Sequence, residues 1–403
     1  METKAGGERP IEENGVMADN AAGAGKVLRF GVIGVGGMGQ GHCKGFAKVA
    51  ETKLTAVCDI DAATAAKVGQ ENGVPHFTTA AALIRSRRCD AVLVATPHPV
   101  RPPIVIAAMK AGLHVISEKP LCERVSAADR MLETAKKTGV AFGVMFQRRT
   151  EPAVAKAIEI CRSGTIGRIY RATMISPEYR SQAYYDSGSW RATWIGEGGG
   201  VMMNQSPHIL DLFIQMAGAP CEVTGHVETR LHKIEVEDLA EAMLTYPDGG
   251  TGYLYCSTCE AGPGQMIEIF GDKGKLLYRN GEMKLWTFEQ TIQEFTTENT
   301  AMWGSPKSIE QTVTIEPGES GHHVIVRNFA RHVLFGEKLI SPAADGLASL
   351  ELANAIWLSS FRKKPVKLPI NRKAYDNFLA GMRRRYEGKK DVVAHRETDP
   401  QHL

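Results

Sequence analysis

Phe30-Gly31-Val32-Ile33-Gly34-Val35-Gly36-Gly37-Met38-Gly39 is the stretch of this 403-residue chain that decides its fold. An apolar, strand-like run leads directly into a glycine-rich turn, and a helix-like segment follows the turn. Gly34, Gly36 and Gly39 match G-x-G-x-x-G, in which the glycines allow a tight turn, a close approach to a pyrophosphate and close packing of helix on strand. Free amides and partial positive charge favour a diphosphate at such a helix N-terminus. The residues expected to hold it are Gly34, Gly36, Gly37, Met38 and Gly39.

An acidic residue in the expected place supports a dinucleotide site. The run Lys53–Cys58 predicts a second strand, and Asp59 follows it, twenty residues after Gly39. In the dinucleotide-binding fold, an acid near this position accepts hydrogen bonds from the adenosine ribose and repels a 2′-phosphate. The sequence therefore favours NAD over NADP. The alternative is a glycine turn without a ligand, but strand, turn, helix and acid occur here in register.

The composition excludes several classes of protein. A hydrophobic content of 43% and a charged content of 23% are ordinary for a globular chain, and the length suggests two domains with a short extension. The net charge of +3 is too small to indicate nucleic-acid binding, and no apolar run has the length of a membrane span. Residues 1–26 lack the apolar segment of a secretory signal, so we expect a flexible N-terminal tail and a cytoplasmic protein.

The eight cysteines do not form a recognisable metal or disulfide pattern. Several lie inside apolar runs, where a free thiol behaves as a small hydrophobic group. Cys256 and Cys259 form one C-x-x-C without a second pair to complete a zinc site, and their neighbours predict a strand. We therefore expect reduced structural thiols and no metal.

Strand-like and helix-like runs alternate between residues 27 and 150. Buried parallel strands separated by helices predict a doubly wound α/β sheet of the Rossmann type, so we expect residues 27–150 to form the NAD-binding domain. The expected strands are Val27–Ile33, Lys53–Cys58, Asp90–Ala95, Leu113–Ser117 and Val140–Phe146. The expected helices are Met38–Ala50, Asp61–Asn72, Ala80–Ser86, Pro102–Ala111 and Ser126–Thr138.

The pattern changes after Glu151. A helix over Pro152–Arg162 and long β-type runs joined by glycine-containing turns predict an α+β domain with a large, mostly antiparallel open sheet over residues 151–370. We expect this domain to bind substrate and to contact a partner subunit, and we expect an amphipathic helix over Ala344–Phe361. The expected strands are Ile166–Ser176, Glu222–Leu231, Leu239–Tyr246, Thr251–Ser257, Met266–Gly271 and Lys275–Arg279.

Residues 371–403 form a charged C-terminal extension. It carries the basic runs Arg383-Arg384-Arg385 and Lys389-Lys390. Such runs are typical either of a solvated helix face or of an arm that binds a neighbouring subunit. We favour the solvated face.

Two segments carry side chains that suit chemistry. The expected strand Leu113–Ser117 leads into Ser117-Glu118-Lys119-Pro120. Cofactors and substrates meet beyond the carboxyl ends of such strands. There the Lys119 ammonium can hold a hydroxyl and stabilise negative charge on oxygen, unless it is an ordinary surface lysine. The second segment runs from Trp190 to Asp211 and contains Asn204 and His208, which are four residues apart and share one face of a helix.

The second segment favours a functional histidine. Histidine is the natural proton acceptor near neutral pH, although a lone histidine is more often part of a core. The glycine run 198–200 precedes His208 and predicts a close approach of the backbone to a ligand. Together with Asn204 one turn before it, this run favours a role in catalysis.

With these motifs the chain resembles the Gfo/Idh/MocA oxidoreductases, the family of glucose–fructose oxidoreductase and inositol dehydrogenase. The resemblance covers about residues 27 to 370 and rests on four motifs: the glycine turn, the Ser-Glu-Lys-Pro segment, Gly164-Thr-Ile-Gly167, and the run G-G-G-V-M-M-N-Q-S-P-H-I-L-D-L. It implies a Rossmann domain followed by an open-sheet domain, NAD as the cofactor, and a homodimer or homotetramer formed through the open sheet.

The resemblance also implies roles for single residues. Lys119 matches the active-site lysine of the family and His208 its catalytic histidine. The segment Thr96-Pro97-His98 matches one that lines the nicotinamide, and Glu118 and Lys119 are expected to contact the cofactor as well. Where many relatives have Asp, this chain has Asn204, which cannot carry a proton but can orient a hydroxyl by donating and accepting.

These features together predict reversible oxidation of an alcohol, in which His208 removes the hydroxyl proton and Lys119 steadies the oxygen. We expect an NAD-dependent dehydrogenase acting on a secondary ring hydroxyl, with C3 favoured, of a sugar, glycoside, anhydrosugar or cyclitol. Aromatic side chains beside an arginine suit the apolar faces and hydroxyl edges of such rings, although a core or interface role is an equal alternative. The expected substrate contacts are Asn204, Tyr185, Trp190 and Arg191.

Two other functions stay open on the sequence. One is a redox-neutral NAD-dependent glycosidase or lyase, which oxidises its sugar transiently and reduces it again. The other is a nucleotide-bound sensor without catalysis. Net release of NADH separates the dehydrogenase from the first, and the joint presence of Lys119 and His208 argues against the second.

Overall fold

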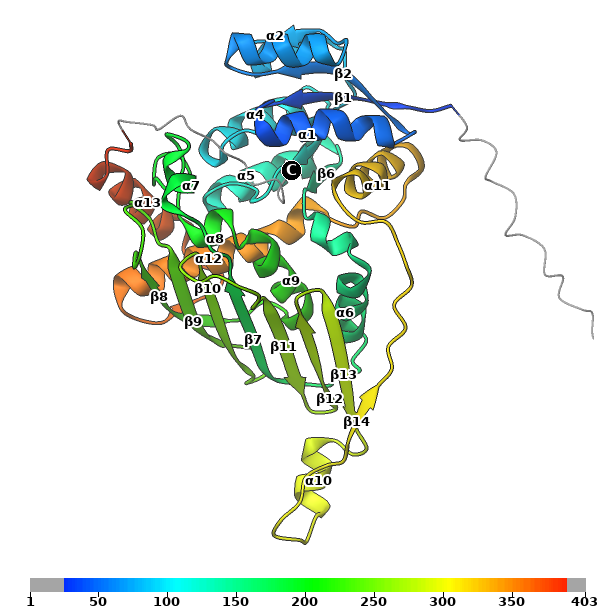
Figure 1. Ribbon diagram of the computed structural model, residues 1–403, viewed down its shortest axis with the longest axis vertical. Helices are drawn as coiled ribbons and strands as arrows, with labels where there is room; N and C mark the ends of the chain where they lie inside the picture. Colours follow the sequence, from blue (N-terminus) through cyan, green and yellow to red (C-terminus); the bar gives the residue numbers. More distant parts are fainter. Residues whose placement is uncertain (1–24, 390–403) are drawn as a thin grey trace, which may run out of the picture.

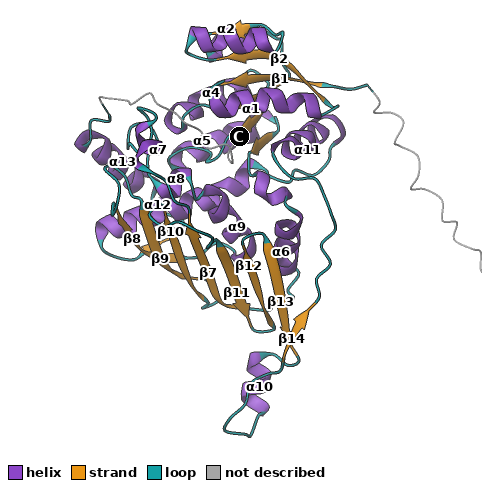
Figure 2. Ribbon diagram, viewed as in Figure 1, coloured by secondary structure: helices purple, strands orange, loops and turns teal. Residues whose placement is uncertain are grey.

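The computed structural model describes residues 25–389, which form two sheets with their helices (Figures 1 and 2). The first sheet and its helices lie at the upper end of Figure 1, and the second sheet extends below them. Residues 1–24 of the expected N-terminal tail and residues 390–403 of the expected extension lie outside the described residues. Between residues 25 and 389, no helix has both the length and the apolar character needed to cross a bilayer.

The first sheet is six-stranded, parallel and doubly wound. Its strand order is β3-β2-β1-β4-β5-β6, so the strand order reverses between β1 and β4. The strands are short and mostly buried because packed side chains cover both faces of the sheet. Their bounds are β1 Leu28–Ile33, β2 Thr52–Cys58, β3 His76–Phe77, β4 Ala91–Val94, β5 His114–Ser117 and β6 Phe142–Val144. The predicted fold class of this half is confirmed.

The connecting helices follow local signals. The side chain of Asp61 caps α2 by accepting the N–H of Thr64 at 2.7 Å, and α5 ends at Gly139 with a left-handed φ of 71°. The helix predicted over Met38–Ala50 is shorter, because a 3₁₀ turn, η1 (Phe46–Lys48), replaces its end. Sequence analysis misses β3, which is too short to show a hydrophobic period. The bounds are α1 Gly37–Gly45, α2 Ala62–Glu71, α3 Ala80–Arg85, α4 Arg101–Lys110 and α5 Val125–Thr138.

The second sheet has nine strands in the order β14-β13-β12-β11-β7-β10-β9-β8-β15. Every neighbouring pair is antiparallel except β7 and β10, which confirms the mostly antiparallel sheet predicted for this half. Its central strands alternate between buried and more exposed positions, as expected where one face is covered. The bounds are β7 Ile169–Pro177, β8 Glu222–Glu228, β9 Leu239–Thr245, β10 Thr251–Ser257, β11 Met266–Gly271, β12 Gly274–Arg279, β13 Glu282–Phe288, β14 Ser308–Gln311 and β15 Val366–Lys367.

Helices cover one face of the second sheet. α6 packs on β12 and β13, α9 on β7 and β11, and α12 on β8 and β9. The helix predicted as amphipathic, α12, is instead buried on most sides, because α5 and α9 pack against it in addition to the sheet. The bounds are α6 Pro152–Arg162, α7 Gln182–Asp186, α8 Val201–Asn204, α9 Pro207–Ala217 and α12 Gly346–Arg362.

A helix from late in the sequence packs on the first sheet. α11 (His322–Phe335) contacts α1 and β1, and Figure 1 shows it beside β6. Its Ile325 and Phe329 join Phe30 and Phe46 in one core cluster. The sequence does not predict that α11 packs on the first sheet, because an amphipathic pattern does not indicate which sheet a helix covers.

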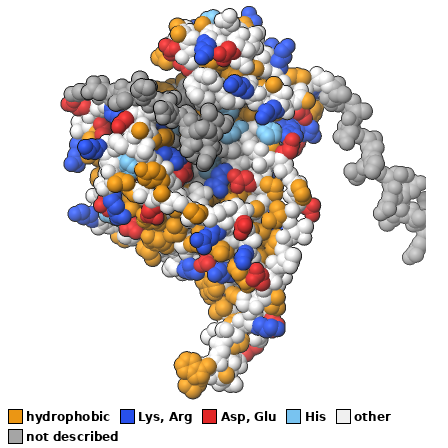
Figure 3. Space-filling view, viewed as in Figure 1, with side chains coloured by type: hydrophobic (Ala, Val, Ile, Leu, Met, Phe, Trp, Pro, Cys, Tyr) orange, Lys and Arg blue, Asp and Glu red, His pale blue; other side chains and the backbone are white. Residues whose placement is uncertain are grey.

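The segment between β13 and β14 forms an arm that projects from the edge of the sheet and carries α10 (Ile292–Glu298) (Figure 1). A capping box between Thr291 and Glu294 starts this helix. Hydrophobic side chains gather at the tip of the arm, where Met302 and Trp303 are 89% and 88% exposed (Figure 3). Sequence analysis misses the arm because its Thr-, Glu- and Gln-rich sequence has no hydrophobic period.

Part of the charged extension is a docked helix. α13 (Arg372–Arg385) buries one face, and Arg383 Nε donates to the main-chain oxygen of Trp194 at 3.0 Å. Arg384-Arg385 are exposed, in line with the predicted solvated face, but Arg383 is not. In Lys389-Lys390, the first ammonium donates to a main-chain oxygen of α7, and the second residue lies outside the described ones. The buried side chains of α13 are Tyr375, Leu379 and Met382.

A buried arginine joins the first sheet to the second half of the chain. Arg149 lies in the turn η3 (Gln147–Thr150) that follows β6. Its guanidinium donates to both carboxylate oxygens of Asp211, at 2.6 and 2.7 Å, and to Asp345 at 2.7 Å. Arg149 and Asp211 are both buried. Removing one partner of such a pair leaves an uncompensated buried charge.

We expect Arg149→Leu to destabilise the protein by about 3–5 kcal/mol, because Asp211 then keeps a charge without a partner. The midpoint of urea unfolding measures this loss. Arg29→Leu is a matched control, because Arg29 also contacts both oxygens of an aspartate, Asp90, but at an exposed position. Its midpoint should stay close to that of the wild type, and equal losses in the two variants would contradict the argument.

Candidate active site

The glycine-rich turn has the shape of a phosphate cradle. Gly34 has a φ of +90°, and a Cβ there would lie 2.9 Å from the main chain of Ala95. Gly39 packs so closely on the turn that a Cβ would lie 1.9 Å from the carbonyl oxygen of Gly34. An added Cβ at Gly36 or Gly37 would meet no atom within 4 Å, so the start of α1 faces open space. The turn therefore fits a diphosphate on the helix amides.

Asp59 lies at the end of β2, beside this turn. Its carboxylate accepts the N–H of Val35 at 2.8 Å and the N–H of Asp61 at 3.0 Å, which leaves further lone pairs on both oxygens. The neighbouring side chains Met38 and Ile60 are apolar and exposed. An acceptor with exposed apolar neighbours suits the adenosine end of a dinucleotide.

A buried arginine holds the loops after β4 and β5 together. The guanidinium of Arg101 donates to the main-chain oxygens of Thr96 at 2.6 Å, Glu118 at 2.8 Å, and Pro120. These loops follow the carboxyl ends of adjacent parallel strands, where cofactor and substrate meet in this fold. Lys119 stands between two of the anchored carbonyls, so its backbone is fixed from both sides.

The structure places two predicted cofactor contacts in buried hydrogen bonds. Glu118 Oε1 is 2.6 Å from Nε2 of His42, a residue of α1 that sequence analysis does not single out. His98 is buried, and its Nδ1 is 3.0 Å from the main-chain oxygen of Glu197. Thr96 Oγ1 is buried without a hydrogen-bond partner in the described part of the chain. Thr96 Oγ1 is therefore a polar atom of the loop after β4 that the described residues leave unbonded.

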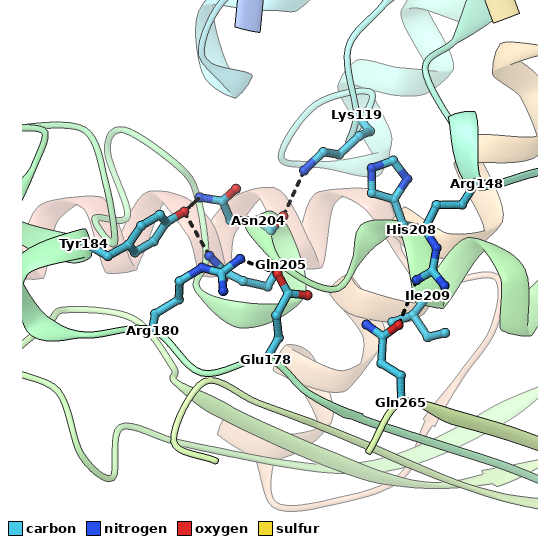
Figure 4. Close-up of a pocket in the computed structure, with 10 residues that line it drawn as sticks. All are labelled: Lys119, Arg148, Glu178, Arg180, Tyr184, Asn204, Gln205, His208, Ile209 and Gln265. Carbon is cyan, nitrogen blue, oxygen red and sulfur yellow. Dashed lines mark hydrogen bonds and ion pairs between the residues drawn. The ribbon is translucent and has the colours of Figure 1, made fainter. Parts of the chain in front are cut away.

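A polar cavity of about 290 Å³ lies below these loops (Figure 4). Lys119 reaches it from the first sheet and donates from Nζ to the main-chain oxygen of Asn204 at 3.0 Å. Three residues singled out in the sequence, Lys119, Asn204 and His208, therefore meet around one space. The complete lining is Lys119, Arg148, Glu178, Arg180, Tyr184, Asn204, Gln205, His208, Ile209 and Gln265.

Asn204 and His208 do not lie on one continuous helix as predicted. α8 ends at Asn204 and α9 begins at Pro207, so a break in the helix separates the two side chains. Both side chains still line the cavity.

The glycine run before α8 approaches protein, whereas the sequence predicts an approach to a ligand. A Cβ on Gly199 would lie 2.3 Å from the ring of Trp357, and one on Gly200 would lie 1.8 Å from the main-chain oxygen of Glu237. The glycines are required because α8 packs tightly on α12 and on the segment before β9. They position the cavity wall without forming it.

Burial sets the protonation of the two central groups. Burial lowers the pKa of His208 well below its usual value, and the Lys119 ammonium lowers it further, so the imidazole is neutral near pH 7. Its Nδ1 is buried and has no hydrogen-bond partner among residues 25–389. Burial also lowers the pKa of Lys119, against the opposing effect of the Glu118 and Glu178 carboxylates. A neutral imidazole can accept a proton, and an ammonium can stabilise an oxygen anion.

Of the four predicted substrate contacts, only Asn204 lines the cavity. Tyr185 is buried, and a core threonine binds its hydroxyl. The guanidinium of Arg191 lies over the rings of Trp190 and Tyr184, 4.7 and 4.4 Å from their centroids. Arg191 therefore supports the wall from behind, and Tyr184 is the aromatic residue that faces the cavity.

Sequence analysis misses most of the remaining lining. Glu178 directly follows β7, and Gln265 directly precedes β11. Because β11 pairs antiparallel with β7, the two residues lie at the same end of this strand pair. Arg148 donates to Gln265 at 2.9 Å, and Arg180 forms an ion pair with Glu178. The signal in the sequence is a polar side chain next to each strand end. It predicts a shared site only when the pairing of the distant strands is known.

One group of potential metal ligands has a structural role. One ligand atom from each of His232, Asp238 and Cys259 lies within 4.8 Å of the others. Asp238 accepts three main-chain amides and is 2.9 Å from His232 Nδ1, while His232 Nε2 bonds the main-chain oxygen of Arg180 at 2.7 Å. These bonds engage the carboxylate and both imidazole nitrogens, so the group braces the loop that carries Arg180. All eight cysteines are unpaired.

Two sequence profiles of one family match the chain. The profile described as an oxidoreductase family with an NAD-binding Rossmann fold matches residues 28–146, and the profile of the GFO/IDH/MocA C-terminal domain matches residues 154–277. The chain belongs to the Gfo/Idh/MocA oxidoreductase family. Its first sheet is therefore an NAD-binding Rossmann domain, and the chain is an NAD-dependent oxidoreductase.

Several similar members of the Gfo/Idh/MocA family are named dehydrogenases. Myo-inositol 2-dehydrogenase of Thermotoga maritima is 27% identical over 350 residues, which are 85% of this chain and 98% of that one. D-apiose dehydrogenase of Paraburkholderia graminis is 24% identical, and the match covers 85% of this chain and 90% of that one. The WlbA dehydrogenase structure from Chromobacterium violaceum was solved with NADH and UDP-GlcNAcA and gives a TM-score of 0.75 at 26% identity. The match covers 86% of this chain and 98% of that one.

We expect Asp59→Asn to weaken the preference for NAD over NADP by about tenfold, because the substitution removes the charge that repels a 2′-phosphate. Fluorescence titrations with NADH and NADPH measure both affinities. Asp61→Asn is the matched control, since Asp61 is exposed on the same loop and caps α2. An unchanged preference for NAD over NADP in Asp59→Asn would show that Asp59 does not contact the adenosine ribose.

Proposed function

We propose that this enzyme oxidises a secondary ring hydroxyl of a sugar, glycoside, anhydrosugar or cyclitol to the ketone, with C3 as the first position to test. The observation that carries the proposal is the meeting of the Lys119 ammonium and the unpartnered His208 imidazole at one polar cavity. The loops after β4 and β5 lie beside this cavity, at the edge of the Rossmann sheet where the nicotinamide binds.

The two side chains have complementary roles in this reaction. His208 is neutral near pH 7, and its imidazole accepts the hydroxyl proton. Lys119, anchored by Asn204, keeps its remaining N–H donors for the substrate oxygen, whose negative charge grows as the proton leaves. When bound, NAD supplies the acceptor for the hydride from the alcohol carbon. Gly34 to Gly39, Asp59 and Thr96 are the residues that would hold it.

The lining of the cavity supports a polyol as substrate. Apart from Ile209, every lining residue carries a hydrogen-bonding or charged group. A ring with several hydroxyls can pair with such a surface, whereas an apolar alcohol would leave buried polar atoms unpaired. The names of the relatives agree, since they include dehydrogenases of myo-inositol, D-apiose and levoglucosan.

We also propose a cytoplasmic homodimer or homotetramer. The open face of the second sheet supports this, because the helices of the chain pack on its other face and leave Met243 of β9 exposed. Light scattering of the purified protein measures the number of subunits.

A panel of cyclitols, free hexoses, glycosides and anhydrosugars tests the proposed reaction. We expect NADH to accumulate with at least one polyol, in an amount that increases with the concentration of that polyol. Turnover of a glycoside without net NADH would instead favour the redox-neutral lyase or glycosidase. No reaction with any member of the panel would contradict the proposal.

We expect His208→Ala to lower kcat by about 10²–10⁴-fold, because the reaction then lacks its proton acceptor. Lys119→Met should lower kcat by about 10²–10³-fold, because the developing oxygen anion loses its donor. Steady-state kinetics on the most active polyol measure both effects. NADH affinity is the internal control and should change little in His208→Ala, and a variant with near-normal turnover would show that its residue has been assigned wrongly.

A further inference from the structure

The side-chain amide of Asn204 is held from two sides. Its Nδ2 donates to Oε1 of Glu197 and, at 3.1 Å, to the hydroxyl of Tyr184. Both amide hydrogens are thereby engaged, and no described residue forms a hydrogen bond with Oδ1. Figure 4 shows this oxygen on the side of the amide away from Tyr184. Asn204 therefore offers the cavity an acceptor and no donor.

Glu197 lies behind Asn204 and does not line the cavity. The residue is 1% exposed, and its second carboxylate oxygen accepts the main-chain N–H of Ala192 at 2.5 Å. Its own main-chain oxygen is 3.0 Å from Nδ1 of His98, on the loop after β4. The carboxylate is therefore held rigidly against the amide.

The chemistry of a carboxylate determines which end of the amide faces it. An ionised carboxylate can only accept hydrogen bonds, so only the NH₂ end of Asn204 can point toward Glu197. A hydrogen bond to a charged group is about twice as strong as one between neutral groups. Without Glu197, the Asn204 amide could turn over and offer a donor to the cavity.

We infer that Glu197 is a positioning residue that fixes Asn204 as a hydrogen-bond acceptor for a free hydroxyl of the substrate. The role of that hydroxyl rests on the proposed function, but the pairing of the two side chains does not. An acceptor at this point selects a hydroxyl and disfavours an ether or carbonyl oxygen, which would face Oδ1 with lone pairs only.

The charge of Glu197 changes in the working range of pH. Burial raises the pKa of Glu197 to about 7, although the Ala192 amide, Arg191, Asn204 and Lys119 act in the opposite direction. A protonated Glu197 can donate to Asn204, so we expect the acceptor to be lost as the pH falls below about 7. The charged and titratable groups that face Glu197 are His98, Lys119, Tyr184, Tyr185, Arg191 and Lys389.

Glu197→Gln tests the orientation of the amide. Its Oε1 can still accept from Ala192, but its Nε2 then points at Asn204, which must turn over and present a donor to the cavity. We expect the KM for myo-inositol or levoglucosan, whichever the wild type oxidises faster, to rise about tenfold, because the substrate O–H that donated to Oδ1 then faces an N–H and loses the acceptor for its proton. The change in kcat should be smaller, and the dependence of kcat/KM on pH near 7 should disappear.

Asn204→Asp tests the contact without any substrate. Two carboxylates then meet, and they must share one proton, so their pKa in the folded protein rises further above the unfolded value. A raised folded pKa gives stability that is lost as the pH rises toward it. We expect the urea midpoint of Asn204→Asp to fall between about pH 7 and pH 9, while this pair leaves the wild-type midpoint level.

The double variant Glu197→Gln with Asn204→Asp exchanges the two groups. Its amide at 197 can accept from Ala192 and donate to Asp at 204, whose other oxygen again faces the cavity as an acceptor. We expect it to recover the KM to within about threefold and to lose the alkaline sensitivity of the single Asp variant. Such reciprocal rescue would not follow if each residue acted only by packing.

Glu235→Gln is the matched control. Glu235 undergoes the same carboxylate-to-amide change nearby, but among residues 25–389 its carboxylate accepts only main-chain amides, those of Trp194 and Gly388. It should leave the KM and the pH profile unchanged. A wild-type KM in Glu197→Gln, or an Asn204→Asp protein no more sensitive to alkaline pH than the wild type, would overturn the inference. Failure of the wild type to oxidise any polyol would contradict the proposed function alone, since the stability of Asn204→Asp would still report on the pair.

Discussion

The hydrogen bond from Lys119 Nζ to the main-chain oxygen of Asn204, 3.0 Å long, is the contact on which the site depends. It joins the end of β5 to the end of α8, and so connects the Rossmann sheet with the second half of the chain. Each end has its own buried support, because Arg101 fixes the carbonyls around Lys119 and Glu197 fixes the amide of Asn204. Since buried charges are costly when unpaired, these supports resist displacement and hold the cavity in one shape.

Signals within short stretches of sequence were enough to predict the first sheet and its central groups. The spacing of Gly34, Gly36 and Gly39 is a recognisable local motif, and Asp59 follows its strand directly. Lys119 is predictable because a strand end is a local feature. The neighbours of His208 indicate a functional histidine, although the helix predicted around it is broken before Pro207.

The residues that were missed depend on contacts between distant segments. Glu178 and Gln265 meet only because β7 pairs with β11 across the sheet. A glycine permits close approach, but the sequence does not say whether a ligand or the protein approaches, and Gly199 faces the ring of Trp357. Neighbours on the short helix α7 point in different directions, so Tyr184 lines the cavity while Tyr185 is in the core.

The role of the Asn204 amide can be understood only together with the residues that it contacts. Compared with the acid that the family resemblance predicts at this position, Asn204 looks like the loss of an acid from the site. In the structure a carboxylate is still present one contact away, at Glu197, and an ionised acid at both positions would require two buried negative charges in contact. One acid and one amide satisfy the pair and still leave an acceptor facing the cavity. Positions 197 and 204 are therefore one unit, and neither can be interpreted from the identity of its residue alone.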